Sequence, residues 1–183
     1  MLKWILALLL LFPVLGFSQE GTVPPLQVVP TVDLDRYLGT WYEIARLPNR
    51  FQTHCAGDVT ATYSWRNDGD LLVINRCRTA DGQISEAEGR AKIADKSGPN
   101  SKLKVRFAPG FLTFLPFVWG DYWIIGLAED YSYAVIGEPA RRYLWVLSRT
   151  PTMDEGTLQS VLDIIGKQGY DLTNLLRTSQ TDK

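Results

Sequence analysis

Two short alternating segments joined by a tight turn constrain the fold of this chain more than any other feature. Along Val59–Trp65, apolar and aromatic residues occupy every second position, and the positions between them are threonine or serine. This period of two is typical of a strand with one buried face. Asn67-Asp68-Gly69 is a strong hairpin signal, and Leu71–Arg78 returns as the second strand. Pairing across this turn places Tyr63 near Val73 and predicts an antiparallel sheet.

The rest of the chain predicts six more strands and one helix. The further strands are Trp41–Leu47, Ile84–Ala94, Leu103–Phe107, Asp121–Ala128, Tyr133–Ile136 and Tyr143–Arg149. A capping box predicts the start of an amphipathic helix, with Thr152 as the N-cap and the Glu155 side chain bonding back to it. The apolar stripe of this helix includes Leu158 and Ile165. Eight antiparallel strands with short turns favour a closed barrel, which has no exposed edges and can hold one small ligand. The predicted fold class is all-β, an eight-stranded antiparallel up-and-down β-barrel with one C-terminal α-helix packed outside.

The N-terminal residues predict export. Residues 1–18 have a positively charged start, an apolar run and small residues at the end, as a signal peptide does. The run is too short and too interrupted for a comfortable membrane span. No cysteine follows the expected cleavage point, so we expect a protein without a lipid anchor, in the periplasm, at the outer membrane or secreted. The expected divisions are a signal peptide at 1–18, an extended linker at 19–32, a folded domain at 33–178 and a polar tail at 179–183.

Export also favours a disulfide between the two cysteines, Cys55 and Cys77. Two buried free cysteines are the alternative. Because Pro48–Asp58 is predicted to be a loop, Cys55 lies beyond direct register with Cys77, and the bridge requires the loop to fold back. His54 is the only histidine and no Cys-x-x-Cys occurs, so we expect no catalytic residue, no metal site and no cofactor. The formal charge of −1 and the absence of a Lys/Arg cluster argue against a nucleic-acid partner.

Two positions far apart in the sequence are candidate partners. Gly39 allows a sharp entry into the first strand, and Trp41 then anchors a large apolar ring. Arg149 ends the eighth predicted strand. A guanidinium over an indole face is a favourable pair, worth roughly 0.5–2 kcal/mol.

Residues 109–120 form an apolar run without a charge between two predicted strands. Loops usually carry polar residues, and large exposed apolar patches mark binding surfaces. We therefore interpret this run as a pocket rim or a tip that touches a membrane, with simple burial over the core as the alternative. Its aromatic residues are Phe111, Phe114, Phe117 and Trp119.

Three motifs occur in order along the chain. They are Tyr37-Leu38-Gly39-Thr40-Trp41-Tyr42-Glu43-Ile44-Ala45-Arg46, then Asp121-Tyr122-Trp123-Ile124-Ile125 with Asp130-Tyr131, and Tyr143-Leu144-Trp145-Val146-Leu147-Ser148-Arg149-Thr150-Pro151. With them, the chain from about Asp33 to Thr178 resembles the lipocalin family, most closely the bacterial lipocalins and apolipoprotein D. The resemblance implies a calyx that binds a small hydrophobic ligand, with Trp41 and Arg149 closing its base. It also implies a pocket lined by Tyr63, Asn75 and Trp145, and a mouth that carries loop 109–120.

Strand alternation adds further residues to the expected ligand site. The apolar side chains expected to face the ligand are Val59, Ala61, Val73, Val105 and Phe107. Asn75 is then a polar group in an apolar cup, suited to the head group of a fatty acid or lysophospholipid. A buried amide satisfied within the protein is the alternative.

The expected function is that of a non-catalytic carrier of a small hydrophobic ligand, a fatty acid or lysophospholipid, in cell-envelope lipid transport, storage or repair. An enzyme such as a lipocalin-type isomerase is the less favoured alternative, for which Glu43 is the one carboxylate expected inside. A second alternative is a module that holds a membrane or a partner protein through residues 109–120. Both a monomer and a homodimer fit the sequence.

Overall fold

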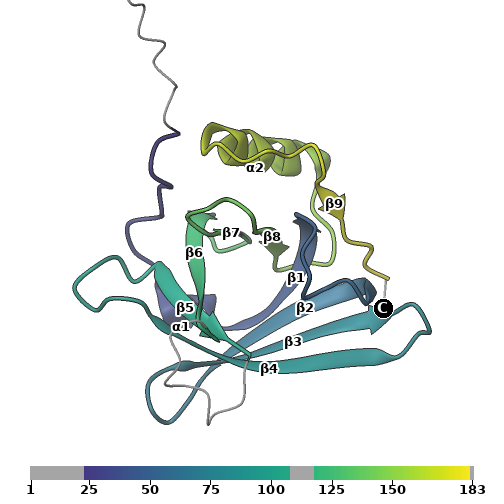
Figure 1. The fold of residues 1–183 in the computed structure, drawn as a ribbon, viewed down its shortest axis with the longest axis horizontal. Coiled ribbons are helices and arrows are strands. Elements are labelled where there is room, and N and C mark those ends of the chain that lie inside the picture. Colours follow the sequence, from purple (N-terminus) through teal and green to yellow (C-terminus); the bar gives the residue numbers. More distant parts are fainter. Residues whose placement is uncertain (1–22, 108–117, 182–183) are drawn as a thin grey trace, which may run out of the picture.

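The chain folds into a closed antiparallel β-barrel with a helix against its outer wall (Figure 1). The computed structural model describes residues 23–107 and 118–181. The elements in chain order are α1 (Leu34–Tyr37), β1 (Gly39–Arg46), β2 (Cys55–Trp65), β3 (Leu71–Thr79), β4 (Ile84–Ile93), β5 (Lys102–Arg106), β6 (Gly120–Leu127), β7 (Tyr133–Gly137), β8 (Leu144–Ser148), α2 (Glu155–Lys167) and β9 (Leu176–Arg177).

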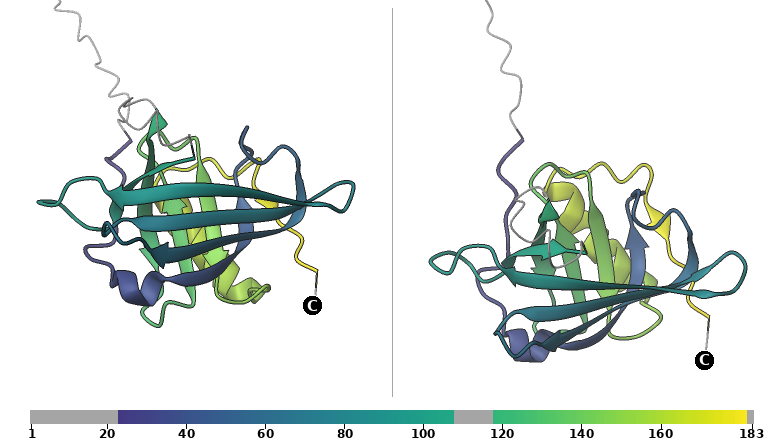
Figure 2. Two further views of the ribbon diagram at one scale, coloured as in Figure 1. Left: turned by 90° about the horizontal axis from the view of Figure 1, so that it is seen from below. Right: turned by 60° about the horizontal axis from the view of Figure 1, so that its bottom comes forward.

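The barrel has the predicted up-and-down topology. Strands β2 to β8 pair with their neighbours in sequence order, and β1 closes the barrel because it pairs with both β8 and β2. The short strand β9 pairs with Ala45 and Arg46 at the end of β1, beyond the part of β1 that pairs with β2. Figure 2 shows β2, β3 and β4 as long strands that extend past the shorter ones. Tyr63 lies opposite Val73, as the hairpin signal predicts.

The predicted start of β2 is wrong, because the strand begins at Cys55 rather than at Val59. Cys55 lies opposite Thr79, and the β2–β3 register shifts on both sides of Gly57. Such irregularities bend a strand, so Cys55 reaches Cys77 from within the strand, without the expected folding back of a loop. The predicted disulfide is confirmed: the two Cα atoms are 5.6 Å apart and the bridge links β2 to β3.

Two hydrophobic clusters lie on opposite sides of the sheet. The inner cluster fills the barrel around Trp41, Tyr63 and Ile136. The outer cluster lies between the sheet and α2, where Leu158, Val161 and Ile165 of the predicted stripe are buried. The helix therefore packs outside the barrel, as expected from its single apolar face.

The N-cap of α2 differs from the predicted one. Asp154, not Thr152, is the N-cap, and its carboxylate accepts a hydrogen bond from the backbone N–H of Thr157. Glu155 does not complete a capping box but forms an ion pair with Arg177 of β9. Among the described residues, no helix has the length and apolar character required to cross a membrane.

The segments that flank the barrel in sequence pack against it. Before α1 the chain is extended, with Leu26 in the outer cluster and Val32 in the inner cluster. After β9, the backbone N–H of Thr178 donates to the carbonyl of Ile44 in β1. The backbone N–H of Asp58 in β2 donates to the carbonyl of Ser179. The C-terminal segment therefore lies along the junction of β1 and β2.

Candidate functional site

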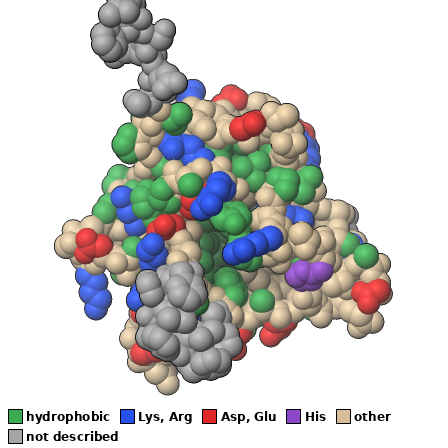
Figure 3. All heavy atoms as spheres, in the orientation of Figure 1, with side chains coloured by type: hydrophobic (Ala, Val, Ile, Leu, Met, Phe, Trp, Pro, Cys, Tyr) green, Lys and Arg blue, Asp and Glu red, His purple; other side chains and the backbone are tan. Residues whose placement is uncertain are grey.

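The two ends of the barrel differ. We call the end covered by α1 the base, and the opposite end, with residues 47–54 between β1 and β2 and residues 138–143 between β7 and β8, the mouth. In Figure 3, which has the orientation of Figure 1, hydrophobic side chains gather around a hollow near the centre. Lys and Arg side chains lie beside this hollow.

The base is closed by the predicted pair. The Cζ atom of Arg149 lies 3.8 Å from the centroid of the Trp41 ring, which is completely buried. The same guanidinium donates hydrogen bonds to the carbonyls of Thr40, at 3.1 Å, and Arg36, at 2.6 Å. Gly39 has φ of +90°, and a Cβ there would lie 3.4 Å from the arginine Nη1. Burial lowers the pKa of Arg149 from its ordinary value, but the group stays a cation because guanidinium pKa values are so high.

Above the base, three tyrosine hydroxyls form a chain inside the barrel. The Tyr122 hydroxyl lies 2.8 Å from that of Tyr37 and 2.7 Å from that of Tyr63. Burial raises the pKa of Tyr63 to about 12 and that of Tyr37 and Tyr122 well above the usual value. All three are therefore neutral hydrogen-bonding groups at physiological pH. Tyr63 is only 4% exposed, so it belongs to the floor of the barrel.

Of the other residues expected to line the site, Ala61, Val73 and Val105 belong to the inner cluster or pack against it. Val59 and Val73 are buried, whereas Ala61, Asn75 and Val105 are half-buried. Asn75 lies opposite Ala61 of β2 and Ala87 of β4. Within the part of the chain that the structure describes, its side-chain amide has no hydrogen-bond partner.

Phe107 lies just beyond the end of β5 and is 42% exposed. A Cβ built on Gly89 would come within 2.6 Å of its ring. The ring therefore covers the backbone of β4 at a position where a side chain would not fit. Of the mouth-loop residues, Phe111, Phe114 and Phe117 lie outside the described residues. Trp119 is described, and Lys92 and Arg106 both lie over its ring.

At the mouth, Trp145 and Glu43 join one hydrogen-bond network. The Trp145 Nε1 donates to Oε1 of Gln52 at 2.8 Å, and Nε2 of Gln52 donates to Glu43 at 2.6 Å. Glu43 also accepts from Arg46 at 2.6 Å and from the Thr178 hydroxyl. The carboxylate is 2% exposed and fully engaged, so it is poorly placed for proton transfer to a ligand.

A row of aromatic rings extends from this network to the solvent-exposed Phe51. The centroid of the Tyr143 ring lies 6.0 Å from that of Trp145, with the planes 18° apart, and 5.5 Å from that of Phe51. Sequence reasoning assigned no role to Phe51, Gln52 or Tyr143. Their only sequence signal was residue type and position: Phe51 and Gln52 lie in the predicted loop Pro48–Asp58, and Tyr143 is the first residue of a predicted strand.

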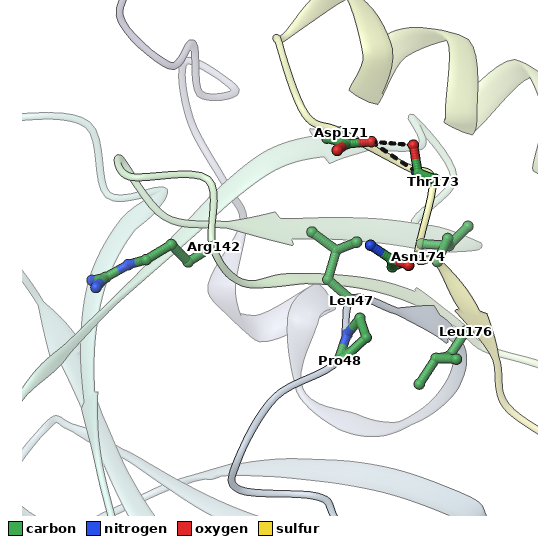
Figure 4. A pocket seen from close by; sticks show the side chains of 8 residues that line it. Leu47, Pro48, Arg142, Asp171, Thr173, Asn174 and Leu176 are labelled. Atoms are coloured by element: carbon green, nitrogen blue, oxygen red, sulfur yellow. Dashed lines mark hydrogen bonds between the residues drawn. The ribbon is translucent and has the colours of Figure 1, made fainter.

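A side-chain cluster and a surface cleft are two further candidates for a metal or ligand site. His54 lies beside the Cys55–Cys77 disulfide, but the sulfurs are bonded to each other and are not free thiolates. A cleft of about 590 Å³ lies near the mouth, between Leu47–Pro48 and the segment Asp171–Leu176. Figure 4 shows Arg142 at one edge of the cleft, with its side chain pointing away from the other labelled residues. This cleft is open to solvent and its lining mixes polar and apolar side chains.

Comparisons with known proteins agree on one family. Residues 32–180 match the family described as a lipocalin-like domain. The chain is 42% identical to temperature-induced lipocalin-1 of Arabidopsis thaliana, over 86% of this chain and 84% of the relative. It is 40% identical to the outer membrane lipoprotein Blc of Escherichia coli (strain K12), over 88% of each chain. Apolipoprotein D of Mus musculus is 31% identical, over 88% of this chain and 84% of the relative.

The solved structure of insecticyanin from the tobacco hornworm Manduca sexta has the same fold. It superposes with a TM-score of 0.67 over 88% of each chain, with 20% sequence identity.

Proposed function

The chain belongs to the lipocalin family, and from this premise we propose that it binds and carries a small hydrophobic ligand, a fatty acid or lysophospholipid. Lipocalins generally bind small hydrophobic molecules in the barrel. The partly exposed side chains on the inward faces support this proposal most directly. Ala61, Val105 and Trp145 are half-buried although they pack against the inner cluster, and the half-buried Asn75 lies opposite Ala61. An interior that leaves its own wall residues partly exposed has room for a ligand.

The chemistry of these residues suits an amphiphile. Burial of an acyl chain against the apolar wall would supply about 25 cal/mol per Å² of apolar surface removed from water. Asn75 offers an amide without a hydrogen-bond partner among the described residues, and a ligand oxygen or a water molecule would satisfy it. Tyr63 would contact only a ligand that reaches the floor.

The proposed carrier is not an enzyme. Catalysis would require a nucleophile or an acid–base group that can reach the ligand. Both cysteines are in a disulfide, His54 lies on the exposed side of the mouth, and the Glu43 carboxylate is engaged by Arg46, Gln52 and Thr178.

The proposed setting is the cell envelope. We propose export, a location in the periplasm, at the outer membrane or outside the cell, and a role in lipid transport, storage or repair. The similarity to Blc, an outer membrane lipoprotein, supports this setting. We propose that loop 109–120 touches the membrane surface. A Phe114→Ser/Phe117→Ser variant should then no longer float with lipid vesicles, and a variant that still floats would contradict the contact. The proposal accommodates a monomer or a homodimer.

The carrier function is tested by native mass spectrometry of the purified protein, followed by extraction and identification of bound lipid. We expect a co-purifying fatty acid or lysophospholipid, and weaker retention in Trp145→Ala, which removes an inward ring. Trp65→Ala is the matched control, because Trp65 is 44% exposed at the base end of β2. A barrel that carries no lipid and binds no added fatty acid would overturn the proposal.

A further inference from the structure

Two arginines at the mouth form no ion pair with any carboxylate of the described residues. Arg50 and Arg142 are exposed, and in residues 23–107 and 118–181 neither guanidinium has an ion-pair or hydrogen-bond partner. Among the described residues, three carboxylates lie nearby, and each has other partners. Glu43 is paired with Arg46, and Glu138 accepts hydrogen bonds from backbone N–H groups of its own connection. Asp171, which lines the same cleft as Arg142, accepts from the backbone N–H and the hydroxyl of Thr173. The guanidiniums of Arg50 and Arg142 are therefore available to an anionic group of a ligand.

Both guanidiniums lie over aromatic rings that touch each other. The Cζ atom of Arg50 is 5.1 Å from the centroid of the Phe51 ring, and that of Arg142 is 5.9 Å from the Tyr143 ring. The two ring centroids are 5.5 Å apart and join the two mouth connections. A guanidinium stacked on a ring keeps its N–H edge free, and this edge matches the oxygens of a carboxylate or phosphate.

The same rings lead from the arginines into the barrel. Phe51 is 54% exposed at the outer end. Tyr143 follows, and Trp145 stacks on it from the inner side and packs against the inner cluster. The indole N–H of Trp145 is already bonded to Gln52, so the stack presents an apolar surface. It provides a continuous path from a positively charged entrance to the interior.

We propose that Arg50 and Arg142 bind the anionic head group, a carboxylate or a phosphate, of a single-chain amphiphile whose acyl chain enters along the rings of Phe51, Tyr143 and Trp145. This inference rests on the proposed carrier function and adds the class of head group and the orientation of the ligand. The protein binds anionic amphiphiles with higher affinity than neutral ones of the same chain length. The head group lies at the mouth and the acyl chain points toward the tyrosine floor.

The test compares three ligands that share a dodecyl chain length and differ in the head: dodecanoate, dodecyl phosphate and dodecanol. Isothermal titration calorimetry below the micellar concentration gives the affinities. The full-length protein is expected to bind both anions at least about tenfold more tightly than the alcohol, as a charge-assisted hydrogen bond predicts. Arg50→Gln/Arg142→Gln is expected to lose about tenfold or more for both anions and to keep its affinity for dodecanol.

The control variant is Arg66→Gln/Arg76→Gln, which removes the same charge from surface ion pairs away from the mouth and should leave all three affinities unchanged. Equal affinities for the three ligands, or an equal loss in the control variant, would overturn the inference and leave the carrier function intact. Displacement of dodecyl phosphate by millimolar inorganic phosphate would also overturn it, because the site would then take a free anion. A protein that binds none of the three ligands would overturn the carrier function itself.

Discussion

Removal of the chain after Thr178 is expected to destabilise the barrel, because the C-terminal segment closes the junction of β1 and β2. Direct pairing of the two strands ends at Tyr42 and Thr60. One residue further along each strand, the side-chain amide of Gln180 donates to the carbonyls of Glu43 and Val59, at 2.9 Å each. This amide takes the place of the next backbone rung between the strands.

The size of the effect follows from the contacts that are lost. Besides the two bonds from Gln180, Ser179 accepts from the backbone N–H of Asp58, and Thr181 donates to the Asp58 carboxylate from its backbone N–H and its hydroxyl. Each hydrogen bond contributes about 1 kcal/mol net. Releasing each of the three ordered residues returns about 1 kcal/mol of backbone entropy. The truncated chain should therefore lose roughly 2 kcal/mol of unfolding free energy.

Urea unfolding followed by tryptophan fluorescence measures this loss. Hydrogen exchange at the Asp58 amide should become faster, because its acceptor is removed. Gln180→Ala deletes two of the bonds, at about 1 kcal/mol each, while the backbone of the segment stays ordered, so it should cost about as much as the truncation. Gln159→Ala on the exposed face of α2 is the matched control. Unchanged stability and unchanged exchange in the truncated chain would refute a closing role for the segment.

Two further predictions concern charged groups. Arg149→Ala should cost about 2–4 kcal/mol in urea unfolding, because it removes the cation over Trp41 and two hydrogen bonds to carbonyls; an unchanged unfolding midpoint would show that this pair does not stabilise the base. The Thr181 backbone N–H, more than any other group, lowers the pKa of Asp58 from 3.8 to about 2. Since the folded pKa is depressed, the stabilisation is complete above the ordinary pKa and is lost as the pH falls from about 4 to about 2. Asp58→Asn should remove this part of the acid sensitivity in unfolding titrations, and an unaltered pH profile would contradict the assignment.

Much of the fold could be predicted because it depends on neighbours in sequence. The alternation along Val59–Trp65 and the turn at Asn67-Asp68-Gly69 fix both the buried face and the register, so the pairing of Tyr63 with Val73 follows. The single apolar stripe of α2 determines that the helix lies on the outer wall. These signals have periods set by the backbone geometry of strands and helices.

The errors occurred where several local solutions are compatible with the same residues. Cys55 lies in a polar segment that reads as a loop, yet it is strand because β3 supplies a partner for it at Thr79. Thr152 and Asp154 are both acceptable N-caps. In the structure Asp154 is the N-cap, and no local pattern distinguishes it from Thr152.

The sequence by itself determined the strand pattern, the helix and the family signature, because each depends on residue types at fixed short spacings. The tertiary structure alone decided that Gln180 bridges two strands and that Phe51 meets Tyr143. It also decided that the hydroxyls of Tyr37, Tyr63 and Tyr122 meet on the floor. These contacts join residues far apart in the chain, and they form only once barrel closure has brought their strands and connections together, so no spacing in the sequence records them.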